Sequence, residues 1–282
     1  MLILVLAAGC GPRADTSSVQ PAEPTSPAAA PELKVHFIDV GQGDAILVET
    51  PAGQRMLVDA GENVYGDLVV SYLLAQGVKE LDVVVGTHTH SDHIGGLDTV
   101  MARFPVKTIY MPRVTQNTKS FEDVLKAVKR QGLTVVTARA GVVIPLQGLD
   151  CRILSPRADR YDELNDYSAV IRLQYGSQSF LLTGDARSIP ENQMLDAGEN
   201  LQATVLKVAH HGSYSSSSAR FLQAVQPAYG IISLGKDNDY GYPHDSTMAR
   251  LARAGIKIYR TDQSGTIVIN TDGSSLQVKT ER

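Results

Sequence analysis

The chain has 282 residues, of which 43% are hydrophobic, and its formal net charge at pH 7 is −4. This length and hydrophobic content suffice for the core of one large domain or of two small ones. The sequence pI of about 6.0 excludes a global basic field that would hold nucleic acid or an anionic membrane. We expect no transmembrane helix, because the sequence contains no apolar run long enough to span a bilayer.

The first ten residues form a short apolar stretch that runs through small residues to Cys10. This pattern resembles a bacterial lipobox, at which a secretory signal is cleaved before a cysteine that receives a lipid. Since no Lys or Arg precedes the stretch, we expect the true start to lie upstream. The alternative interpretation is a first core strand. The pattern predicts an extracytoplasmic lipoprotein anchored to the membrane through Cys10.

Residues 11–32 are rich in Pro, Ala, Ser and Thr and contain almost nothing that could join a core. We interpret this segment as a disordered, extended tether that leads to a folded domain over residues 33–282. The second cysteine, Cys151, lies in an apolar segment. If Cys10 carries a lipid, Cys151 has no disulfide partner, and we expect it to be a buried free thiol.

The predicted elements of the domain alternate between strands and helices. The first half contains three strands that suit a meander, at 34–40, 45–49 and 55–59, followed by a helix at 67–76. A buried strand at 81–85 and two further helices, one from Gly95 onward and one at 119–131, complete this half. The second half contains strands at 150–154, 168–174, 178–182, 203–209, 231–233 and 256–259, helices at 187–197, 216–225 and 246–254, and a hairpin at 265–269 and 276–278. Two such halves predict an α/β fold in which two sheets pack together with helices outside.

The densest group of potential metal ligands is the segment THTHSDH at residues 87–93. It follows the buried strand at 81–85, so its side chains are expected in a strand-to-helix loop that a rigid scaffold can aim at one point. Neutral imidazoles and a carboxylate are the usual donors for a borderline divalent metal such as zinc. The segment therefore predicts a metal site, the alternative being a polar loop of hydrogen-bonded histidines.

Two further predicted strands end in potential ligands. One ends in Asp185, and the other ends in His210 and His211. Each alone would fit a turn aspartate or a capping histidine, but together with residues 87–93 they predict one shared site. Of the seven histidines, only His36 lies inside a predicted strand, and we interpret it as structural.

These motifs resemble a known family. Four of them resemble the motifs of the metallo-β-lactamase fold of metal hydrolases. They are HxHxDH at 88–93, the strand-terminal Asp59 of LVDAG, TGD at 183–185 and HHGS at 210–213. Three further motifs narrow the resemblance to the C-terminal soluble domain of the ComEC/Rec2 competence proteins and their stand-alone relatives. They are HFIDVGQGDA at 36–45, YPH at 242–244 and YRTDQSGTI at 259–267. The resemblance covers about residues 33–282 and implies an αββα sandwich with a dinuclear metal site at the sheet edge.

The resemblance also implies a role for each residue of the site. His88 and His90 are expected to bind one metal ion, Asp92 and His93 the second, and Asp185 both. The implied cofactor is a pair of divalent ions, zinc or manganese.

The remaining ligands and their supports follow from the same resemblance. One of His210 and His211 is expected to complete the second site, with His211 favoured. Asp59 and Asp44 are expected to orient the metal loop rather than to bind metal.

The sequence departs from the wider superfamily before the bridging aspartate. Many members place a further histidine some 15 to 20 residues upstream, where this chain reads NDYS, from Asn165 to Ser168. The first metal is then left with His88, His90 and Asp185, helped by Asn165 or Asp166. An oxygen-richer site shifts the preference toward manganese over zinc.

The implied chemistry is hydrolysis. Two metal ions about 3.5–4 Å apart can activate hydroxide at neutral pH and hold both the attacking and the leaving oxygen of a phosphodiester. Asp92 is expected to orient that hydroxide, and His244 to protonate the leaving group or grip phosphate, unless it is a surface-loop histidine. Ser213, Asn165 and Ser168 are the expected substrate contacts, although the serine run from 213 to 218 could equally cap a helix.

The resemblance implies a nuclease or phosphodiesterase outside the cytoplasm, since in the competence family this domain is proposed to degrade one DNA strand during uptake. Two alternatives are another metallohydrolase of the same fold, acting on a phosphocholine-type ester, a lactone or a lactam, and a binding protein without turnover. The acidic balance argues against tight DNA binding, although Arg113, Lys119 and Lys236 could line a groove.

Overall fold

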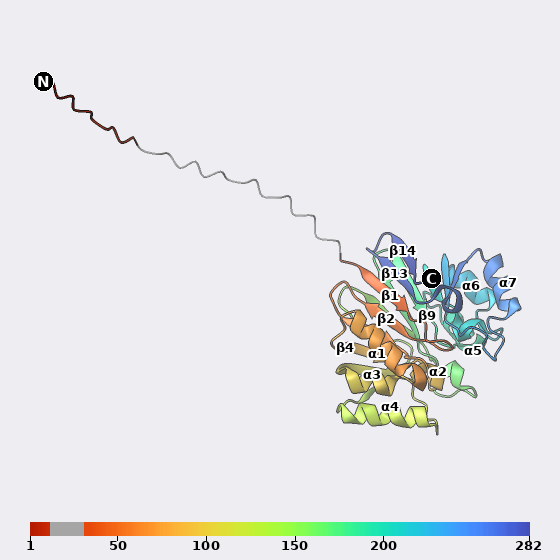
Figure 1. Cartoon of the computed structure of the whole chain (residues 1–282). Helices are drawn as coiled ribbons and strands as arrows, with labels where there is room; N and C mark the ends of the chain where they lie inside the picture. Colours follow the sequence, from red (N-terminus) through yellow and green to blue (C-terminus); the bar gives the residue numbers. More distant parts are fainter. Residues whose placement is uncertain (12–30) are drawn as a thin grey trace. The chain divides into compact units, whose positions relative to one another are not determined.

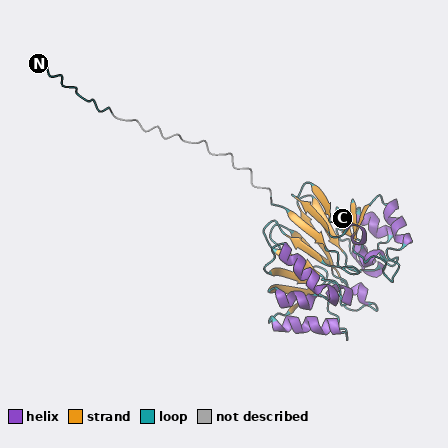
Figure 2. Cartoon of the chain, viewed as in Figure 1, coloured by secondary structure: helices purple, strands orange, loops and turns teal. Residues whose placement is uncertain are grey.

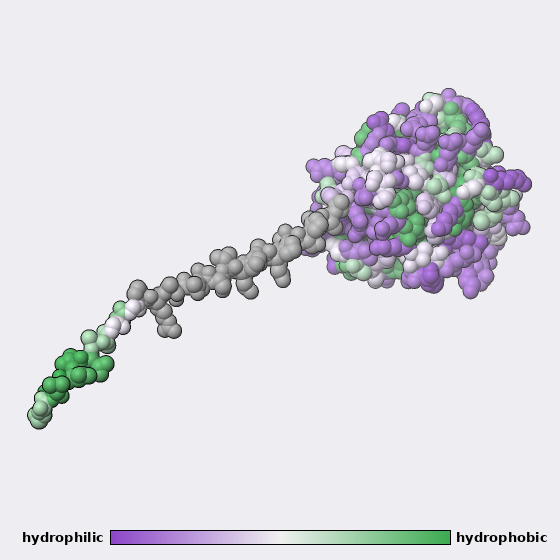
Figure 3. Space-filling view, turned by 90° about the horizontal axis from the view of Figure 1, so that it is seen from above, coloured by the Kyte–Doolittle hydropathy of each residue, from purple (hydrophilic) through white to green (hydrophobic). Residues whose placement is uncertain are grey.

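The structure is a computed structural model that describes residues 1–11 and 31–282. The chain divides into two units, Met1–Ala30 and Pro31–Arg282. The predicted tether lies almost entirely outside the described residues. Residues 1–11 form neither helix nor strand, so the alternative of a first core strand is wrong, and their hydrophobic side chains are exposed (Figure 3).

The first sheet of the second unit has eight strands in the order β14-β13-β1-β2-β3-β4-β5-β6. These strands are β1 (Leu33–Phe37), β2 (Ile46–Glu49), β3 (Arg55–Val58), β4 (Leu81–Val85), β5 (Val106–Met111), β6 (Val135–Thr137), β13 (Ile267–Thr271) and β14 (Leu276–Thr280). The first three form the predicted antiparallel meander, and β3 to β6 run parallel. The C-terminal hairpin pairs with β1 and so completes the sheet of the first half.

The second sheet has six strands in the order β12-β11-β10-β9-β8-β7. They are β7 (Asp150–Ser155), β8 (Val170–Tyr175), β9 (Gln178–Leu182), β10 (Val205–Lys207), β11 (Tyr229–Ile232) and β12 (Lys257–Arg260). The strands from β9 to β12 run parallel, which places their carboxyl ends on one edge.

Helices cover the outer face of each sheet (Figures 1 and 2). The longer helices are α1 (Gly66–Ala75), α3 (Leu97–Arg103) and α4 (Lys119–Arg130) on the first sheet, and α5 (Ser188–Asp196), α6 (Ala219–Val225) and α7 (Asp245–Arg253) on the second. The short elements are α2 (Ser91–Ile94), α8 (Thr261–Ser264), η1 (Asn63–Tyr65), η2 (Leu164–Tyr167) and η3 (Ala209–Gly212). The predicted αββα sandwich is confirmed. Within the described ranges, none of these helices has the length and apolarity needed to cross a membrane.

The alternation of side chains along the strands explains this layering. In β2, Ile46 and Val48 face the core between the sheets, whereas Leu47 faces the helices. In β9, Phe180 faces the inter-sheet core and Leu181 the helices. Because successive residues of a strand point to opposite faces, strands apolar on both faces need cover on both, and a slip of one residue would exchange the two cores.

Two predictions about single residues are confirmed. Cys151 is a free cysteine and is fully buried. His36 is buried in β1, where its Nδ1 lies 2.8 Å from the hydroxyl oxygen of Tyr72 and its Nε2 lies 3.0 Å from Oε1 of Glu49. Both ring nitrogens have partners inside the fold, which is the arrangement of a structural histidine.

Candidate metal centre

The predicted ligands lie where parallel strands end. Asp59 follows β3, His88 follows β4, Asp185 follows β9, and His210 and His211 follow β10. The carboxyl ends of parallel strands form one edge of a sheet, and the packed sheets bring two such edges together. Side chains far apart in sequence therefore meet at one place.

One detail of the prediction was wrong. Asp92 and His93 belong to α2, a single helical turn, and not to the loop between the strand and the helix, and His90 stands at the N-terminal boundary of α2. In this turn the amide N–H groups of His93 and Ile94 both donate to the carbonyl oxygen of His90. Consecutive side chains on this turn can then point into the same site.

Four side chains form the centre of the cluster. Asp92, His93, Asp185 and His211 each place one potential ligand atom within 4.8 Å of the others. Nε2 of His93 lies 3.3 Å from Oδ1 of Asp185, and Nε2 of His211 lies 3.4 Å from Oδ2 of Asp185. Nε2 of His211 also lies 3.3 Å from Oδ2 of Asp92. This geometry favours His211 over His210 as the partner of Asp92 and His93.

The cluster contains buried polar atoms that lack hydrogen bonds. Nε2 of His93, Nε2 of His211 and Oδ1 of Asp185 are buried and have no hydrogen-bond partner among the described residues. Buried polar groups are nearly always paired, so several unpaired ones that converge require an explanation. Imidazole nitrogens with carboxylate oxygens are the donor set of zinc, and fit manganese as well. The residues present therefore fit a divalent metal ion.

A second group adjoins the first through Asp185. Nε2 of His88 lies 3.0 Å from Nδ1 of His90 and 4.0 Å from Oδ2 of Asp185. Nε2 of His210 lies 3.9 Å from the same oxygen. Asp185 thus stands between two sets of histidines, which is the position that its predicted bridging role requires.

Hydrogen bonds outside the cluster fix how each imidazole is presented. Nδ1 of His211 donates to the carbonyl oxygen of Ser233 at 2.8 Å, and Nδ1 of His93 is 2.8 Å from Oδ2 of Asp59. Asp59 also accepts from the hydroxyl of Thr87 at 2.6 Å and from its amide at 2.8 Å. With Nδ1 bonded outward, Nε2 is the nitrogen of His93 and of His211 that faces the site. Asp59 therefore contacts the cluster through His93, on the side away from Asp185.

Asp44 belongs to a buried ion pair behind the same histidines. Its Oδ1 lies 2.9 Å from Nζ of Lys207, and both side chains are at most 1% exposed. Asp44 also lies 3.9 Å from Nδ1 of His93 and from Nδ1 of His211. Sequence reasoning missed Lys207, which is a buried lysine inside β10. Removing either partner would leave a buried charge unpaired.

Mutual charge sets the protonation of the cluster. Burial opposes ionisation of Asp185, yet the neighbouring His211 and His93 hold the pKa of its carboxyl well below its usual range. Burial likewise opposes the charged form of His211, but Asp185 and Asp92 raise its pKa to about 10. The carboxylates thus attract positive charge to this point, and a divalent cation competes with protons for it. His88 differs, because burial and the charge of His93 hold its pKa well below the usual value, which keeps the imidazole neutral.

The backbone is strained at the same residues. Asp59, His210 and His211 have φ angles of 59°, 50° and 52°, a region that residues other than glycine rarely adopt. Such conformations cost of order 1–3 kcal/mol each and cluster at functional sites. Gly43 shows why the VGQGDA motif needs glycine, since its φ is 126° and an added Cβ would lie 2.1 Å from the carbonyl oxygen of Asp92.

A cavity of about 290 Å³, here called the metal cavity, lies over the cluster. Its wall includes Ser91 and five of the predicted ligands, His90, Asp92, Asp185, His210 and His211. The other wall residues are Gln42, Gln116, Thr118, Asn165, Tyr240 and Tyr242. Of these only Asn165 was predicted. Gln42 and Tyr242 could have been found from their places in the VGQGDA and YPH motifs, whereas Gln116, Thr118 and Tyr240 come from loops with no motif of their own.

The remaining predicted substrate contacts lie at different depths. Nδ2 of Asn165 reaches the cavity and lies 3.2 Å from Nε2 of His210. The hydroxyl oxygen of Ser168 is buried and accepts a hydrogen bond from the amide of Asp185 at 3.1 Å. Ser213 is buried with its hydroxyl 3.0 Å from that of Ser215. Ser168 and Ser213 thus stand behind the cavity wall.

Three other residues lie apart from the cluster. His244 lies outside the metal cavity wall, and its Nδ1 accepts a hydrogen bond from the amide of Tyr214 at 3.1 Å. Asp166 pairs with Nε of Arg187 at 3.3 Å and not with the histidines. Ser218 caps α6 by accepting from the amide of Phe221, so the capping interpretation of the serine run holds at that residue.

Comparison with known proteins identifies the family. Residues 38–236 match the model of the metallo-beta-lactamase superfamily. The chain belongs to this superfamily. Proteins with this metallo-β-lactamase fold are usually hydrolases that bind divalent metals, and the His/Asp cluster described above lies inside the matched region.

Relatives narrow the placement within the metallo-β-lactamase superfamily. The chain is 34% identical over 258 residues to ComE operon protein 3 of Bacillus subtilis, covering 86% of the chain and 33% of that protein. It is 33% identical over 245 residues to competence protein ComA of Neisseria gonorrhoeae, again covering 86% of the chain and 33% of that protein. The chain thus spans about a third of the length of these relatives, and the predicted resemblance to competence proteins is confirmed.

A solved structure agrees with the fold. The metallo-beta-lactamase fold protein YhfI of Bacillus subtilis aligns with a TM-score of 0.58 at 14% identity, covering 85% of this chain and 99% of that one. At this identity the likeness concerns the metallo-β-lactamase fold alone.

Proposed function

We propose that this chain is a metal-dependent phosphodiesterase that cleaves DNA outside the cytoplasm. The observation that carries the proposal is the metal cavity, in which a wall made of polar side chains surrounds a buried His/Asp cluster with unpaired ligand atoms. Negative charge develops on the non-bridging oxygens of a phosphodiester during hydrolysis, and a polar, cation-holding site stabilises such charge.

Two groups of residues would hold the cations. His93, His211 and Asp92 would hold one ion, and His88 and His90 the other, with Asp185 shared between them. Two divalent ions held in this way activate water and neutralise charge on phosphoryl oxygens.

His210 supplies a candidate for the nitrogen that the sequence lacks before Asp185. Its Nε2 lies as close to Oδ2 of Asp185 as Nε2 of His88 does, at 3.9 Å against 4.0 Å. His210 would then complete the ion site formed by His88, His90 and Asp185, and Asn165 would orient the ring of His210. His210→Ala should reduce the metal content of the loaded protein from two equivalents to one.

The composition of the wall favours a phosphodiester over a lactam or a lactone. All twelve residues that line the metal cavity carry a polar side-chain atom. Sites for drug-sized organic substrates are lined mainly by apolar side chains, with a few polar groups that orient the ligand. A phosphate group, which accepts hydrogen bonds on every side, matches the side chains of Gln42, Thr118 and Asn165.

The rim of the cavity suits a nucleotide. The rings of Tyr240 and Tyr242 stack with 5.3 Å between their centroids and 13° between their planes, and Tyr240 is 61% exposed. Bases of single strands stack on exposed aromatic rings with little dependence on sequence, at about 1–3 kcal/mol per base. Asp92 would orient the attacking water, and His244 remains our candidate for the proton donor to the leaving oxygen.

The relatives and Cys10 support a location outside the cytoplasm. The relatives are competence proteins, and Cys10 is exposed at the end of an apolar stretch. We propose that a lipid on Cys10 anchors the protein. The wild-type protein should then fractionate with membranes and Cys10→Ser should not, whereas a wild-type protein found wholly in the cytosol would contradict the anchor.

One assay tests the activity. Protein loaded separately with Zn²⁺ and Mn²⁺ should hydrolyse linear DNA and bis-p-nitrophenyl phosphate but not nitrocefin, and a chelator should abolish both reactions. Asp185→Asn serves as the inactive control. Hydrolysis of nitrocefin alone, or of none of the three by protein shown to hold metal, would contradict the proposal.

A further inference from the structure

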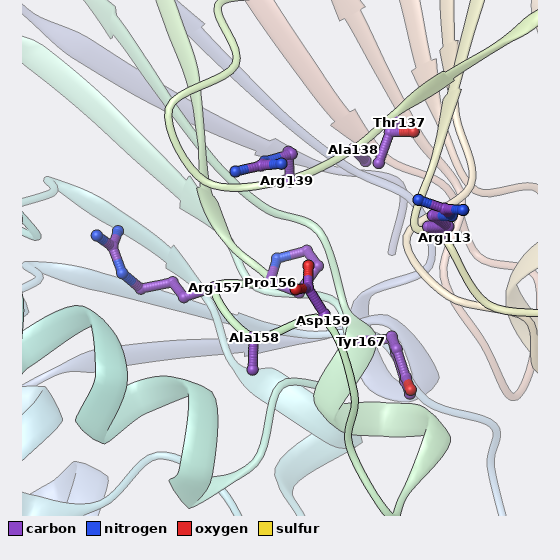
Figure 4. Close-up of a pocket in the computed structure, with 9 residues that line it drawn as sticks. All are labelled: Arg113, Thr137, Ala138, Arg139, Pro156, Arg157, Ala158, Asp159 and Tyr167. Atoms are coloured by element: carbon purple, nitrogen blue, oxygen red, sulfur yellow. The ribbon is translucent and has the colours of Figure 1, made fainter.

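A second cavity, of about 410 Å³, is lined by three arginines (Figure 4). Arg113 comes from the loop after β5, Arg139 from the segment after β6, and Arg157 from the loop after β7. Tyr167 of η2 completes the wall, and Asp159 is its single carboxylate. We call this cavity the arginine pocket.

The charges of the arginine pocket are largely uncompensated. Arg157 pairs with Oε1 of Glu199 at 2.6 Å. Arg113 and Arg139 have no acidic partner within 4.0 Å among the described residues. All three arginines are exposed, so an anion can reach their guanidinium groups from solvent. Arginine is also the side chain whose planar donors best match a phosphate group.

The arginine pocket adjoins the metal cavity through two shared segments. The loop after β5 supplies Arg113 to the arginine pocket and Gln116 to the metal cavity. In the same way, η2 supplies Tyr167 to the arginine pocket and Asn165 to the metal cavity. Three residues of chain span at most about 11 Å, and two at most about 7 Å. A nucleic-acid strand carries a phosphate about every 3.4 Å along its axis. A strand held at the metal cavity therefore presents further phosphates within reach of the arginines.

We propose that the arginine pocket binds a backbone phosphate of the nucleic-acid strand whose scissile phosphate lies at the metal centre. The inference rests on the proposed function in that this strand is the substrate. It also explains how a chain with a net charge of −4 holds a polyanion, because the positive charge is local. Of the basic residues singled out in the sequence, Arg113 lies in this pocket, Lys119 pairs with Asp123, and Lys236 lines neither cavity.

The test compares a long and a short substrate. The double variant Arg113→Gln/Arg139→Gln should raise KM for a fluorescein-labelled single-stranded DNA 16-mer roughly tenfold or more, because the variant cannot make charge-assisted hydrogen bonds to a phosphate there. Its kcat, and its hydrolysis of bis-p-nitrophenyl phosphate, should stay at wild-type values, since the small diester cannot reach the pocket. The slope of log K for the 16-mer against log salt should become shallower by about 0.7 for each phosphate that the variant no longer neutralises.

Two matched variants control for charge. Arg130→Gln removes an arginine from the C-terminal end of α4, outside both cavities, and should leave KM unchanged. Asp159→Asn removes the opposing carboxylate and should lower KM for the 16-mer. Wild-type KM and salt slope in the double variant overturn the inference while the proposed function stands.

The inference can also be tested if the protein hydrolyses neither substrate. The proposed function then fails. Binding of the labelled 16-mer, measured by fluorescence anisotropy in the presence of a chelator, then tests the arginine pocket. Weaker binding by the double variant than by wild type and Arg130→Gln supports the pocket. Equal binding by all three, or no binding by any, overturns it.

Discussion

Two buried clusters of histidine and carboxylate in this chain differ in whether their polar atoms have partners. In the first, here called the His36 cluster, His36 bonds to Tyr72 and Glu49, and the second oxygen of Glu49 lies 2.7 Å from Nη2 of Arg55. In the metal centre, by contrast, the ligand atoms of His93, His211 and Asp185 face one another without a hydrogen bond among the described residues. The two clusters contain similar residue types and are similarly buried. They differ in whether the histidine nitrogens and carboxylate oxygens have hydrogen-bond or ion-pair partners.

The difference follows from where each cluster lies on the strands. The His36 cluster lies on β1, β2, β3 and α1, where both ring nitrogens of His36 and both carboxylate oxygens of Glu49 have partners. The metal centre lies beyond the ends of strands, where side chains from both sheets converge on a cavity. Burial of a histidine is therefore a weak sign of function, whereas unpaired atoms that converge on a cavity are a strong one.

The largest expected effect comes from removing the carboxylate that joins the two sets of histidines. Asp185→Asn should reduce hydrolysis of both diesters by at least about 10³-fold, because losing one stabilising group at the reacting oxygens alone costs about 10²–10³-fold. Metal content should fall as well. Asp92→Asn should act in the same direction. Steady-state rates together with metal analysis measure the effect, and wild-type rates in both variants would place the activity elsewhere.

His244→Ala sharpens the comparison by separating ligands from proton donors. Nδ1 of His244 is occupied by the amide of Tyr214, and its ring centroid lies 5.1 Å from that of Tyr242 on the cavity wall. The variant should lose roughly 10²–10⁴-fold in kcat, the usual range for a general acid, and keep its full metal content. Loss of one metal equivalent instead would make His244 a ligand and would displace His210 from that role.

The position of each cluster relative to the strand ends also decides how much of it could be predicted from the sequence. Histidines at the ends of predicted strands were assigned to the site and the one inside a strand to the fold. The structure brings His88, His90, His93, His210 and His211 together, whereas His244 lies outside the cavity wall. What sequence could not reach are contacts made by distant segments. Lys207 reads as one polar residue in a strand, and its role as the partner of Asp44 exists only once β10 packs against the loop after β1. Tyr240 and Gln116 have no motif that marks them.

Some elements of the fold were missed for a related reason. The strands β5 and β6 alternate weakly, since β5 contains Lys107 and Thr108 and β6 has only three residues. Their pairing is parallel to β4 and depends on tertiary contacts more than on local pattern. The turn α2 was predicted as loop because four residues are too few for a helical period to be visible.

Asp59→Asn tests the support behind the metal centre. Asp59 accepts three hydrogen bonds, two from Thr87 and one from Nδ1 of His93, and an amide cannot reproduce all of them. Partners of metal-bound histidines typically contribute 10–100-fold to metal affinity, and we expect a loss in that range with residual activity at saturating metal. Titration with Zn²⁺ or Mn²⁺ measures it. Unchanged affinity would mean that the orientation of His93 does not depend on Asp59.

Glu49→Gln, finally, should affect stability and spare function, because the His36 cluster closes on itself. Burial tends to raise the pKa of Glu49, but the hydrogen bond from His36 and the charge of Arg55 lower it overall. A carboxylate with a depressed folded pKa contributes stability that is present above the unfolded pKa, about 4.3, and lost as the pH falls through the folded value. Urea denaturation should therefore find the variant about 1–3 kcal/mol less stable at pH 7, with the difference shrinking below about pH 4. Metal content and diester hydrolysis should match wild type at pH 7, and a loss of metal there would mean that the two clusters are coupled.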